Sequence, residues 1–473
     1  MLRVARAGAF ALVLVTACES STDDQGHARE WTPLVAALDL DPDPDVVEID
    51  LVAEVASVEL VPGIATEVWA YRDAGDPSGE ARVPGPAIEA ELGDRLIVHL
   101  RNELPQGTTL HWHGLRLPDT MDGNPMVGGT IGAGESATAE FVLRDEGLHW
   151  YHPHVYADEQ IQRGLQGTLV VRGPDEPDAD VERVLVLDDV MLDDEGSIVL
   201  EPTSEDLMLG RRGNALLVNG TIPAIARAAA GSVERWRLVN TSNGRYFALG
   251  IGDIPFTVVG WDGGPVAEPY ETAQLVIAPG ERYDVLVPII RDDGDRLLLE
   301  THAFGRGRGA EDPGPFTLLE LDVIGRANLP GTIDAPSRTL ATIDIDDATQ
   351  VQRFELRHET GLGAGAVFTI NDQRWPLNTP VHVDHGDTEI WEVVNEGDHD
   401  HPFHLHGLRF QVLDRDGVAE PTLGWKDTVR VAPRGTTRLA VTYEEPGMWM
   451  FHCTIPEHAE RGMMGDLMVM LPK

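Results

Sequence analysis

Four short histidine motifs constrain the fold of this chain more than any other feature of its sequence. Residues i and i+2 of a β-strand point to the same side, so a His-x-His pair on a strand presents two imidazoles side by side. Imidazole nitrogens are good ligands for copper, zinc, iron and nickel. We therefore expect these motifs to bind metal ions. The motifs hold nine of the seventeen histidines: His111-Trp112-His113, His152-Pro153-His154, His401-Pro402-Phe403-His404-Leu405-His406, and His452-Cys453 with His458.

The remainder of the sequence predicts an all-β chain. Helical periodicity is scarce, and short β-rich runs are bounded by Gly, Pro, Asp and Asn. Examples are residues 95–100, 167–171, 233–239 and 389–394. Regular short strands separated by turn residues are typical of β-sandwiches and barrels.

One strand signal occurs three times along the chain. A glycine opens each strand, and an asparagine ends it nine residues later: Gly93 and Asn102, Gly231 and Asn240, Gly386 and Asn395. Repeated signals of this kind indicate related structural units, and 473 residues are too many for one ordinary core. Loops rich in Asp and Pro near residues 173–177 and 329–331 mark the breaks. We predict domains at residues 45–175, 176–330 and 331–473.

The cysteine of the last motif narrows the choice of metal. A thiolate with two histidines and a distant methionine is the ligand set of blue-copper sites. Cys453, His458 and Met463 supply three of these ligands from one loop, and His401 is the candidate for the second histidine. On a strand, His452 would face away from Cys453 and towards a different metal ion.

These motifs, in this order and placement, resemble those of the multicopper oxidases. The three-domain bacterial laccases and copper-efflux oxidases are the most similar branch, and the resemblance covers about residues 45–472. Residues 147–152, 279–284 and 425–428 (GLHWYH, PGERYD and WKDT) support it. The resemblance implies three cupredoxin-like Greek-key β-domains. The first and third would share a three-copper cluster, and the third would hold the type 1 copper.

The resemblance also implies a ligand for each copper ion. The type 1 copper would be bound by His401, Cys453 and His458, with Met463 axial, and the type 2 copper by His111 and His404. The type 3 pair would be bound by His113, His152, His154, His406 and His452. Asp122 matches a family acid that relays protons near the cluster. An Asp122-Gly123 pair is also typical of an ordinary turn.

Two positions depart from the family pattern. Thr454 stands where a type 3 histidine would directly follow the cysteine, and Ala459, followed by Glu460, stands where many relatives have an acid. A hydroxyl is a poor replacement for an imidazole on copper. Three outcomes remain open. Another group completes the site and activity persists, or the copper is held weakly and oxygen reduction is slow. Otherwise the cluster is incomplete, and the protein is mainly an electron-transfer or copper-binding module.

The implied activity is that of an oxidase. A small-molecule donor (a phenol or aromatic amine) or a metal ion would give single electrons through the exposed edge of His458, and dioxygen would be reduced to water. The route would run through Cys453 and His452. The formal net charge of −43 argues against a nucleic-acid partner and would concentrate cations, although solubility alone also explains it.

The N-terminus predicts export. Arg3 and Arg6 precede an apolar run at residues 9–17, which is typical of a signal peptide and too short to span a bilayer. Val15-Thr16-Ala17-Cys18 is similar to a bacterial lipobox, and a simple cleaved signal is the alternative. We predict a signal at residues 1–18, a polar tether at 19–44, and a periplasmic or outer-membrane-anchored lipoprotein. A lipid on Cys18 would be its only membrane contact. Cys453 would then be the one remaining thiol, which excludes a disulfide.

Overall fold

The structure, a computed structural model, describes residues 30–472 apart from 328–330, 332, 334 and 362–364. In this part of the chain strands predominate, and the α-helices have only four to six residues. The all-β prediction is confirmed. No helix among the described residues is long and apolar enough to cross a bilayer. The predicted signal peptide, Cys18 and the first part of the tether lie outside the described residues.

The strands form three sandwiches in chain order. The first contains β1 (Val46–Val61), β2 (Ile64–Asp73), β3 (Ile88–Glu91), β4 (Arg95–Asn102), β5 (His111–His113), β6 (Ser136–Val142), β7 (Gly147–His152) and β8 (Gly167–Arg172), with η1 (Asp119–Met121) and α1 (Ala157–Gln160). The second contains β9 (Val181–Val190), β10 (Ala215–Val218), β11 (Ile225–Ala230), β12 (Val233–Asn240), β13 (Phe247–Gly250), β14 (Phe256–Trp261), β15 (Gly264–Thr272), β16 (Leu275–Ile277), β17 (Arg282–Pro288), β18 (Arg296–His302) and β21 (Phe316–Arg326). It also carries α2 (Ser204–Leu209) and the hairpin of β19 (Phe304–Gly305) and β20 (Glu311–Asp312). The third contains β22 (Gln350–Gly361), β23 (Gly365–Ile370), β24 (Val381–Asp384), β25 (Thr388–Asn395), β26 (His401–Leu405), β27 (Phe410–Arg415), β28 (Thr428–Val431), β29 (Thr436–Thr442), β30 (Gly447–Cys453) and β31 (Met464–Met470), with η2 (Ile345–Asp347) and α3 (Pro456–Ala459).

The three sandwiches share one strand arrangement. In each, the strand that carries the repeated signal (β4, β12 or β25) runs parallel to an earlier strand (β1, β9 or β22) and antiparallel to a later one (β6, β17 or β29). Neighbours that are not consecutive in sequence are the mark of Greek-key connections. Each sandwich has its own apolar core. The predicted domain limits near residues 175 and 330 fall between the three groups of strands and stay predictions.

The repeated asparagine has the same task in every sandwich. Asn102 donates from Nδ2 to the carbonyl oxygens of Gln106 at 2.9 Å and Ile131 at 2.8 Å, and its Oδ1 accepts from Leu104 N. Asn240 and Asn395 make the equivalent three bonds. One buried amide thus pairs two backbone groups of the loop after the strand and one carbonyl of a distant segment, as buried polar groups require.

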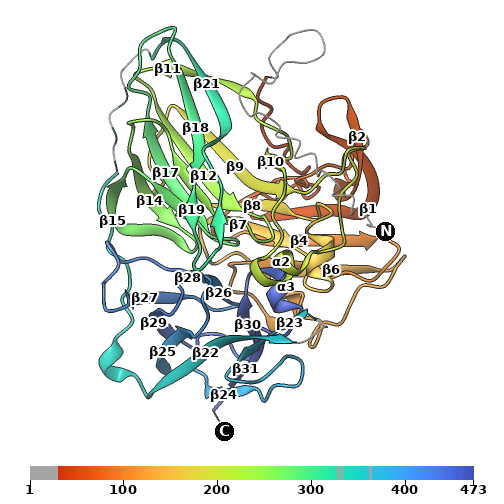
Figure 1. Cartoon of the computed structure of the whole chain (residues 1–473), viewed down its shortest axis with the longest axis vertical. Coiled ribbons are helices and arrows are strands. Elements are labelled where there is room, and N and C mark those ends of the chain that lie inside the picture. Colours follow the sequence, from red (N-terminus) through yellow and green to blue (C-terminus); the bar gives the residue numbers. More distant parts are fainter. Residues whose placement is uncertain (1–29, 328–330, 332, 334, 362–364, 473) are drawn as a thin grey trace, which may run out of the picture.

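Figure 1 shows how the sandwiches meet. The third (blue) forms one end of the molecule, and the first (orange) and second (green) lie together at the other. Strand β7 of the first sandwich contacts β12 and β17 of the second. The short helices α2 and α3 lie beside each other near the centre of the view, where the three sandwiches converge.

We expect Asn102→Ala to lower the free energy of unfolding by about 1–3 kcal/mol, because two carbonyls would lose a buried donor. Urea unfolding followed by tryptophan fluorescence measures this. Asn102→Asp keeps the acceptor for Leu104 but loses both donated hydrogens, so it should also destabilise. Unchanged unfolding midpoints in both variants would contradict the role given to this amide.

Candidate metal centre

Strand register brings the four histidine motifs into two facing pairs. In the first sandwich β5 and β7 are antiparallel, and His111 lies opposite His152. In the third, β26 and β30 are antiparallel, and His404 lies opposite His452. Each pair therefore joins two motifs that are distant in sequence.

Strand alternation then sorts the C-terminal motifs onto two faces. His404, His406 and His452 point to one side of the sheet, and His401 and Cys453 point to the other. Phe403 is the residue paired with Cys453, which places the thiol on the core side of the third sandwich. His452 and Cys453 thus belong to different sites, as the sequence predicts.

Seven buried histidines meet between the first and third sandwiches. The Nε2 atom of His452 lies 3.1 Å from Nε2 of His154 and 2.9 Å from Nε2 of His406. His113 and His404, from different sandwiches, stack with ring centroids 3.7 Å apart. Two sets of ring nitrogens lie close enough to hold a metal ion: His154, His406 and His452, and His111, His113 and His404. The predicted convergence of the two ends of the chain is therefore confirmed.

The ring nitrogens that point away from the cluster are anchored. The Nδ1 atoms of His152, His404 and His452 donate to the carbonyls of Pro153, Asp427 and Cys453 at 2.8–2.9 Å. The Nε2 atoms of His111, His152 and His404 point inward, buried and without a hydrogen-bond partner among the described residues. Buried polar atoms rarely remain unpaired, and histidines that bind metal usually have the opposite ring nitrogen held by a carbonyl or carboxylate. The donor set therefore fits copper ions.

Asp122 holds one histidine from the first sandwich and one from the third. Its Oδ2 accepts from His406 Nδ1 at 2.7 Å, and its Oδ1 and main-chain oxygen accept from His111 Nδ1 at 3.1 and 2.9 Å. Burial raises the pKa of this carboxyl, and His111 opposes that shift. Gly123 has φ +75° in the same turn, so the residue is both part of a turn and a contact of the cluster. Its proton relay stays a proposal.

The second site lies within the third sandwich. The Nδ1 atoms of His401 and His458 are 3.2 Å apart, and the Cys453 sulfur lies 3.7 and 3.5 Å from them. Met463 is fully buried in the same loop, where its carbonyl accepts from Cys453 N at 3.1 Å and its N–H donates to His458 O at 3.0 Å. One loop thus positions three of the four predicted ligands.

Burial sets the protonation of this second site. It lowers the pKa of His401 to about 3 and holds that of His458 well below its usual range, so both imidazoles are neutral and able to bind a metal ion. Burial raises the pKa of the Cys453 thiol. A buried thiolate therefore needs a bound cation, and metal affinity is coupled to loss of the thiol proton.

The prediction that one edge of the His458 ring is exposed is wrong. Its side chain is fully buried, and its Nε2 donates to the main-chain oxygen of Met208 at 3.1 Å. Met208 lies on α2 of the second sandwich and packs against the core of the third. Helix α2 contacts α3, which carries His458, so it covers the face through which a donor would approach. The sequence carries no local signal of this contact.

Thr454 turns away from the histidines. Its hydroxyl donates to Pro279 O of the second sandwich at 2.7 Å, and the residue is half-buried beside a cavity that His113 and His152 also line. The position where the family pattern has a third imidazole therefore holds a side chain bonded elsewhere.

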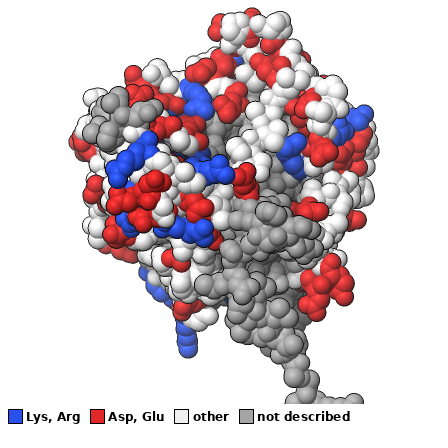
Figure 2. Space-filling view, turned by 90° about the horizontal axis from the view of Figure 1, so that it is seen from above, with Lys and Arg blue, Asp and Glu red and all other residues white. Residues whose placement is uncertain are grey.

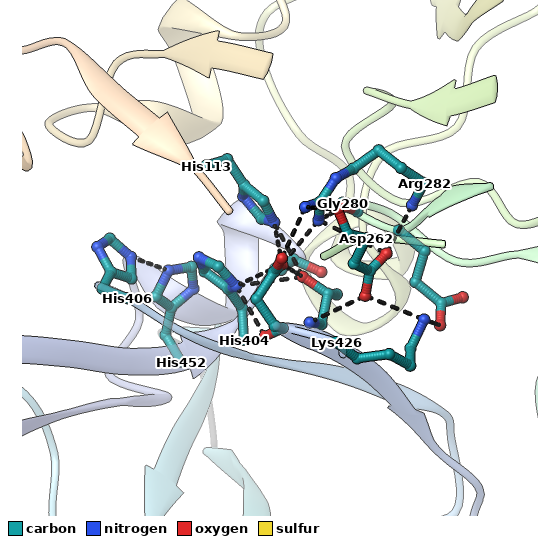
Figure 3. A network of polar contacts seen from close by, with 12 residues as sticks. His113, Asp262, Gly280, Arg282, His404, His406, Lys426 and His452 are labelled. Atoms are coloured by element: carbon teal, nitrogen blue, oxygen red, sulfur yellow. Dashed lines mark hydrogen bonds and ion pairs between the residues drawn. The ribbon is translucent and has the colours of Figure 1, made fainter. Parts of the chain in front are cut away.

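A buried ion pair connects all three sandwiches to the cluster (Figure 3). Arg282, on β17, makes a bidentate pair with Asp427 at 2.7 and 2.6 Å. Asp427 Oδ1 lies 3.3 Å from both His113 Nε2 and His404 Nδ1, and the neighbouring Thr428 hydroxyl contacts the same two nitrogens. Burial alone would raise the pKa of Asp427, but Arg282 and the hydrogen bonds hold it well below its usual range. The anion is thus ready to orient two histidines.

Lys426 extends the network. Its ammonium lies 3.0 Å from Asp262 and 3.3 Å from Glu281, with almost no exposed surface. Sequence reasoning noted the stretches that contain Arg282 and Asp427 but gave these residues no role. A usable signal was present, because Lys426 is one of only two lysines in the chain.

A buried site with one cysteine and two histidines beside a cluster of seven histidines defines a copper protein with two kinds of centre. Comparison with known proteins agrees. Profiles of the multicopper oxidase family match residues 78–176, 184–299 and 342–472, and the chain belongs to this family.

Individual relatives span most of the chain. Multicopper oxidase MmcO of Mycobacterium tuberculosis is 30% identical over 423 residues, 80% of each chain. Cell division protein FtsP of Photorhabdus laumondii is 30% identical over 413 residues, 81% of this chain and 82% of its own. A solved multicopper oxidase from Campylobacter jejuni, titled a metallo-oxidase, superimposes with a TM-score of 0.83 at 26% identity, covering 96% of this chain and 98% of its own.

The three sandwiches are therefore cupredoxin-like domains of a copper-dependent oxidase. The enzyme uses oxygen as its acceptor and a small molecule or metal ion as its electron donor.

We expect Arg282→Leu to lower the free energy of unfolding by about 3–5 kcal/mol, because Asp427 would keep a buried charge without its partner. Arg282→Lys should recover only part of this, since an ammonium cannot bind both carboxylate oxygens in a fork. Chemical unfolding of the copper-free protein measures both. As the matched control, Arg296→Leu removes the surface pairs of an exposed arginine with Glu320 and Asp322 and should cost about 0–1 kcal/mol. Equal effects at the two arginines would contradict the role of the buried pair.

Proposed function

We propose that the chain is a laccase-like oxidase that couples single-electron oxidation of its donor to reduction of dioxygen to water. His401, Cys453 and His458, with Met463 axial, would hold the type 1 copper, and His111 and His404 the type 2 copper. The type 3 pair would be held by His113, His152, His154, His406 and His452. Copper, when bound at these positions, supplies the one-electron chemistry, and the chain sets its potential, access and proton supply.

One observation carries this proposal. His452 and Cys453 are consecutive residues whose side chains enter the two different metal sites. The peptide between them is the shortest covalent connection between the donor-side site and the cluster, and the His452 Nδ1–H also donates to the main-chain oxygen of Cys453 at 2.8 Å. Such an arrangement has no use in a protein with only one of the two sites.

The residues around the cluster also suggest how protons reach it. Asp122 is buried against His111 and His406, and burial raises the pKa of its carboxyl, which favours a group that can hold a proton beside the cluster. Glu460 lines the cavity on the other side of the cluster and accepts from Ala157 N at 2.9 Å. These two carboxyls are the proposed relay.

The donor we favour is a small cation or neutral aromatic molecule. Acidic side chains are spread over much of the face in Figure 2, and the net charge of −43 repels anionic donors. Helix α2, whose Met208 covers His458, also carries the exposed Glu205 and the half-buried Asp206. The Campylobacter jejuni enzyme is described as a metallo-oxidase, which makes a metal ion such as Cu(I), Fe(II) or Mn(II) a further candidate.

We also propose that the chain is exported. The basic start, apolar run and lipobox-like Val15-Thr16-Ala17-Cys18 support a lipoprotein signal, with the mature protein periplasmic or anchored to the outer membrane.

A second candidate function is a copper-binding or electron-transfer module without oxidase turnover. Thr454 is the observation that favours it, because the second type 3 copper would lack one imidazole. FtsP, to which the chain is also similar, is named a cell division protein and not an oxidase. Copper content and oxygen uptake separate the two. About four copper ions per chain and oxygen consumption with a phenolic dye support the oxidase, and about one copper without oxygen uptake supports the module.

We expect Cys453→Ser to abolish the intense blue absorption of the copper-loaded protein, because that band requires a thiolate on copper. Visible absorption with copper analysis measures this, and copper at the seven-histidine cluster should remain. Cys18→Ser serves as the control, since it removes the other cysteine of the chain and should leave the colour unchanged. An intense thiolate band in Cys453→Ser would contradict the type 1 assignment.

A further inference from the structure

A cavity opens beside the cluster at the one position where the ligand set is short. It is lined by His113, His152, His154 and His452 from the cluster, by Gly280, Thr241 and Ser242 of the second sandwich, and by Thr454. Thr454 and Glu460 are half-buried while the four histidines are at most 8% exposed, so solvent reaches the cavity past these two side chains. The cavity lies on the side of the cluster where the family's third imidazole is missing.

Thr454 does not fill this space. Its hydroxyl donates to Pro279 O at 2.7 Å, which turns the oxygen towards the second sandwich. The wall behind it is tight, because a Cβ at Gly280 would lie 3.1 Å from both His113 Cε1 and Thr454 Cγ2. The methyl group of Thr454 thus packs against the wall, and no side chain of the described residues takes the place of the absent ring.

The two imidazoles beside the cavity are prepared as ligands. His152 Nε2 is buried without a hydrogen-bond partner, and Trp150 stacks on its ring with centroids 4.0 Å apart. His113 is held through Nε2 by the Thr428 hydroxyl at 2.9 Å. Both rings are fixed independently of Thr454, so a third donor could join them without rearrangement of the protein.

The lining of the cavity selects the chemistry of that donor. Ala157, Ile161, Pro456, Ala459 and Met464 supply an apolar wall. Glu460 is the acidic residue of the lining, and burial raises the pKa of its carboxyl. An apolar wall favours a neutral molecule, and copper favours nitrogen donors over hydroxyls.

We propose that the cavity beside Thr454 binds a small neutral nitrogen donor, of which imidazole is the simplest, and that this molecule completes the ligand set left short by His113 and His152. This inference rests on the proposed copper sites. The place of the third imidazole would then be taken by a diffusible ligand and not by a residue of the chain.

Two measurements on the copper-loaded protein test the proposal without using turnover. Isothermal titration calorimetry with imidazole should give one saturable site per chain. Dialysis against a copper chelator, with and without imidazole, should show slower copper loss when imidazole is present. The Cys453 blue band, recorded in the same samples, reports separately whether the proposed type 1 site is loaded.

The matched variants are Thr454→His and Thr454→Val. Thr454→His supplies the ring from the chain, so imidazole should bind at least about tenfold more weakly, and copper should be retained in the chelator without imidazole. Thr454→Val keeps the size of the side chain and removes only the hydroxyl, so it should bind imidazole as the wild type does.

Each other outcome overturns the proposal. If the wild type shows the blue band but binds no imidazole, the type 1 assignment stands and the cavity is not a ligand site. Equal imidazole binding by the wild type and Thr454→His would place the ligand elsewhere. Loss of imidazole binding in Thr454→Val would mean that the hydroxyl itself is the recognised group. Absence of the blue band after copper loading would instead reject the proposed function.

Discussion

The bidentate pair between Arg282 and Asp427 is the interaction on which the rest of the metal centre depends. None of the described residues of the second sandwich contributes a histidine to the cluster. Its Arg282 nevertheless fixes the Asp427 carboxylate, which contacts one histidine from each of the other two sandwiches. A buried carboxylate in this position would cost several kcal/mol without its cation. The middle domain therefore acts as the support of a site formed by its neighbours.

The same low-polarity surroundings explain why the site takes metal ions. Desolvation lowers the pKa of most of the clustered imidazoles and keeps them neutral. Their free ring nitrogens are therefore available to a metal ion instead of a proton. Burying so many polar rings destabilises the fold, and the apolar packing of three separate sandwich cores offsets this cost. Folding and metal affinity are thus coupled through burial.

Strand spacing explains which features the sequence could predict. The His-x-His pairs, the alternation of His452 and Cys453, and the three asparagines depend on period-two geometry or on local loops, and each can be recognised from neighbouring residues. The cover of α2 over His458 and the contact of Arg282 with Asp427 join segments from different sandwiches. No periodicity encodes such contacts, because they arise only when independently folded domains pack against each other.

The hydrogen bond from His458 to Met208 O changes how a donor can be chosen. With the imidazole edge covered, electrons must tunnel through α2 from a partner that stays outside the protein surface. Tunnelling depends on distance and driving force and is tolerant of molecular shape. Chemically unrelated reductants could then serve equally well, provided that each can rest briefly against the same short helix.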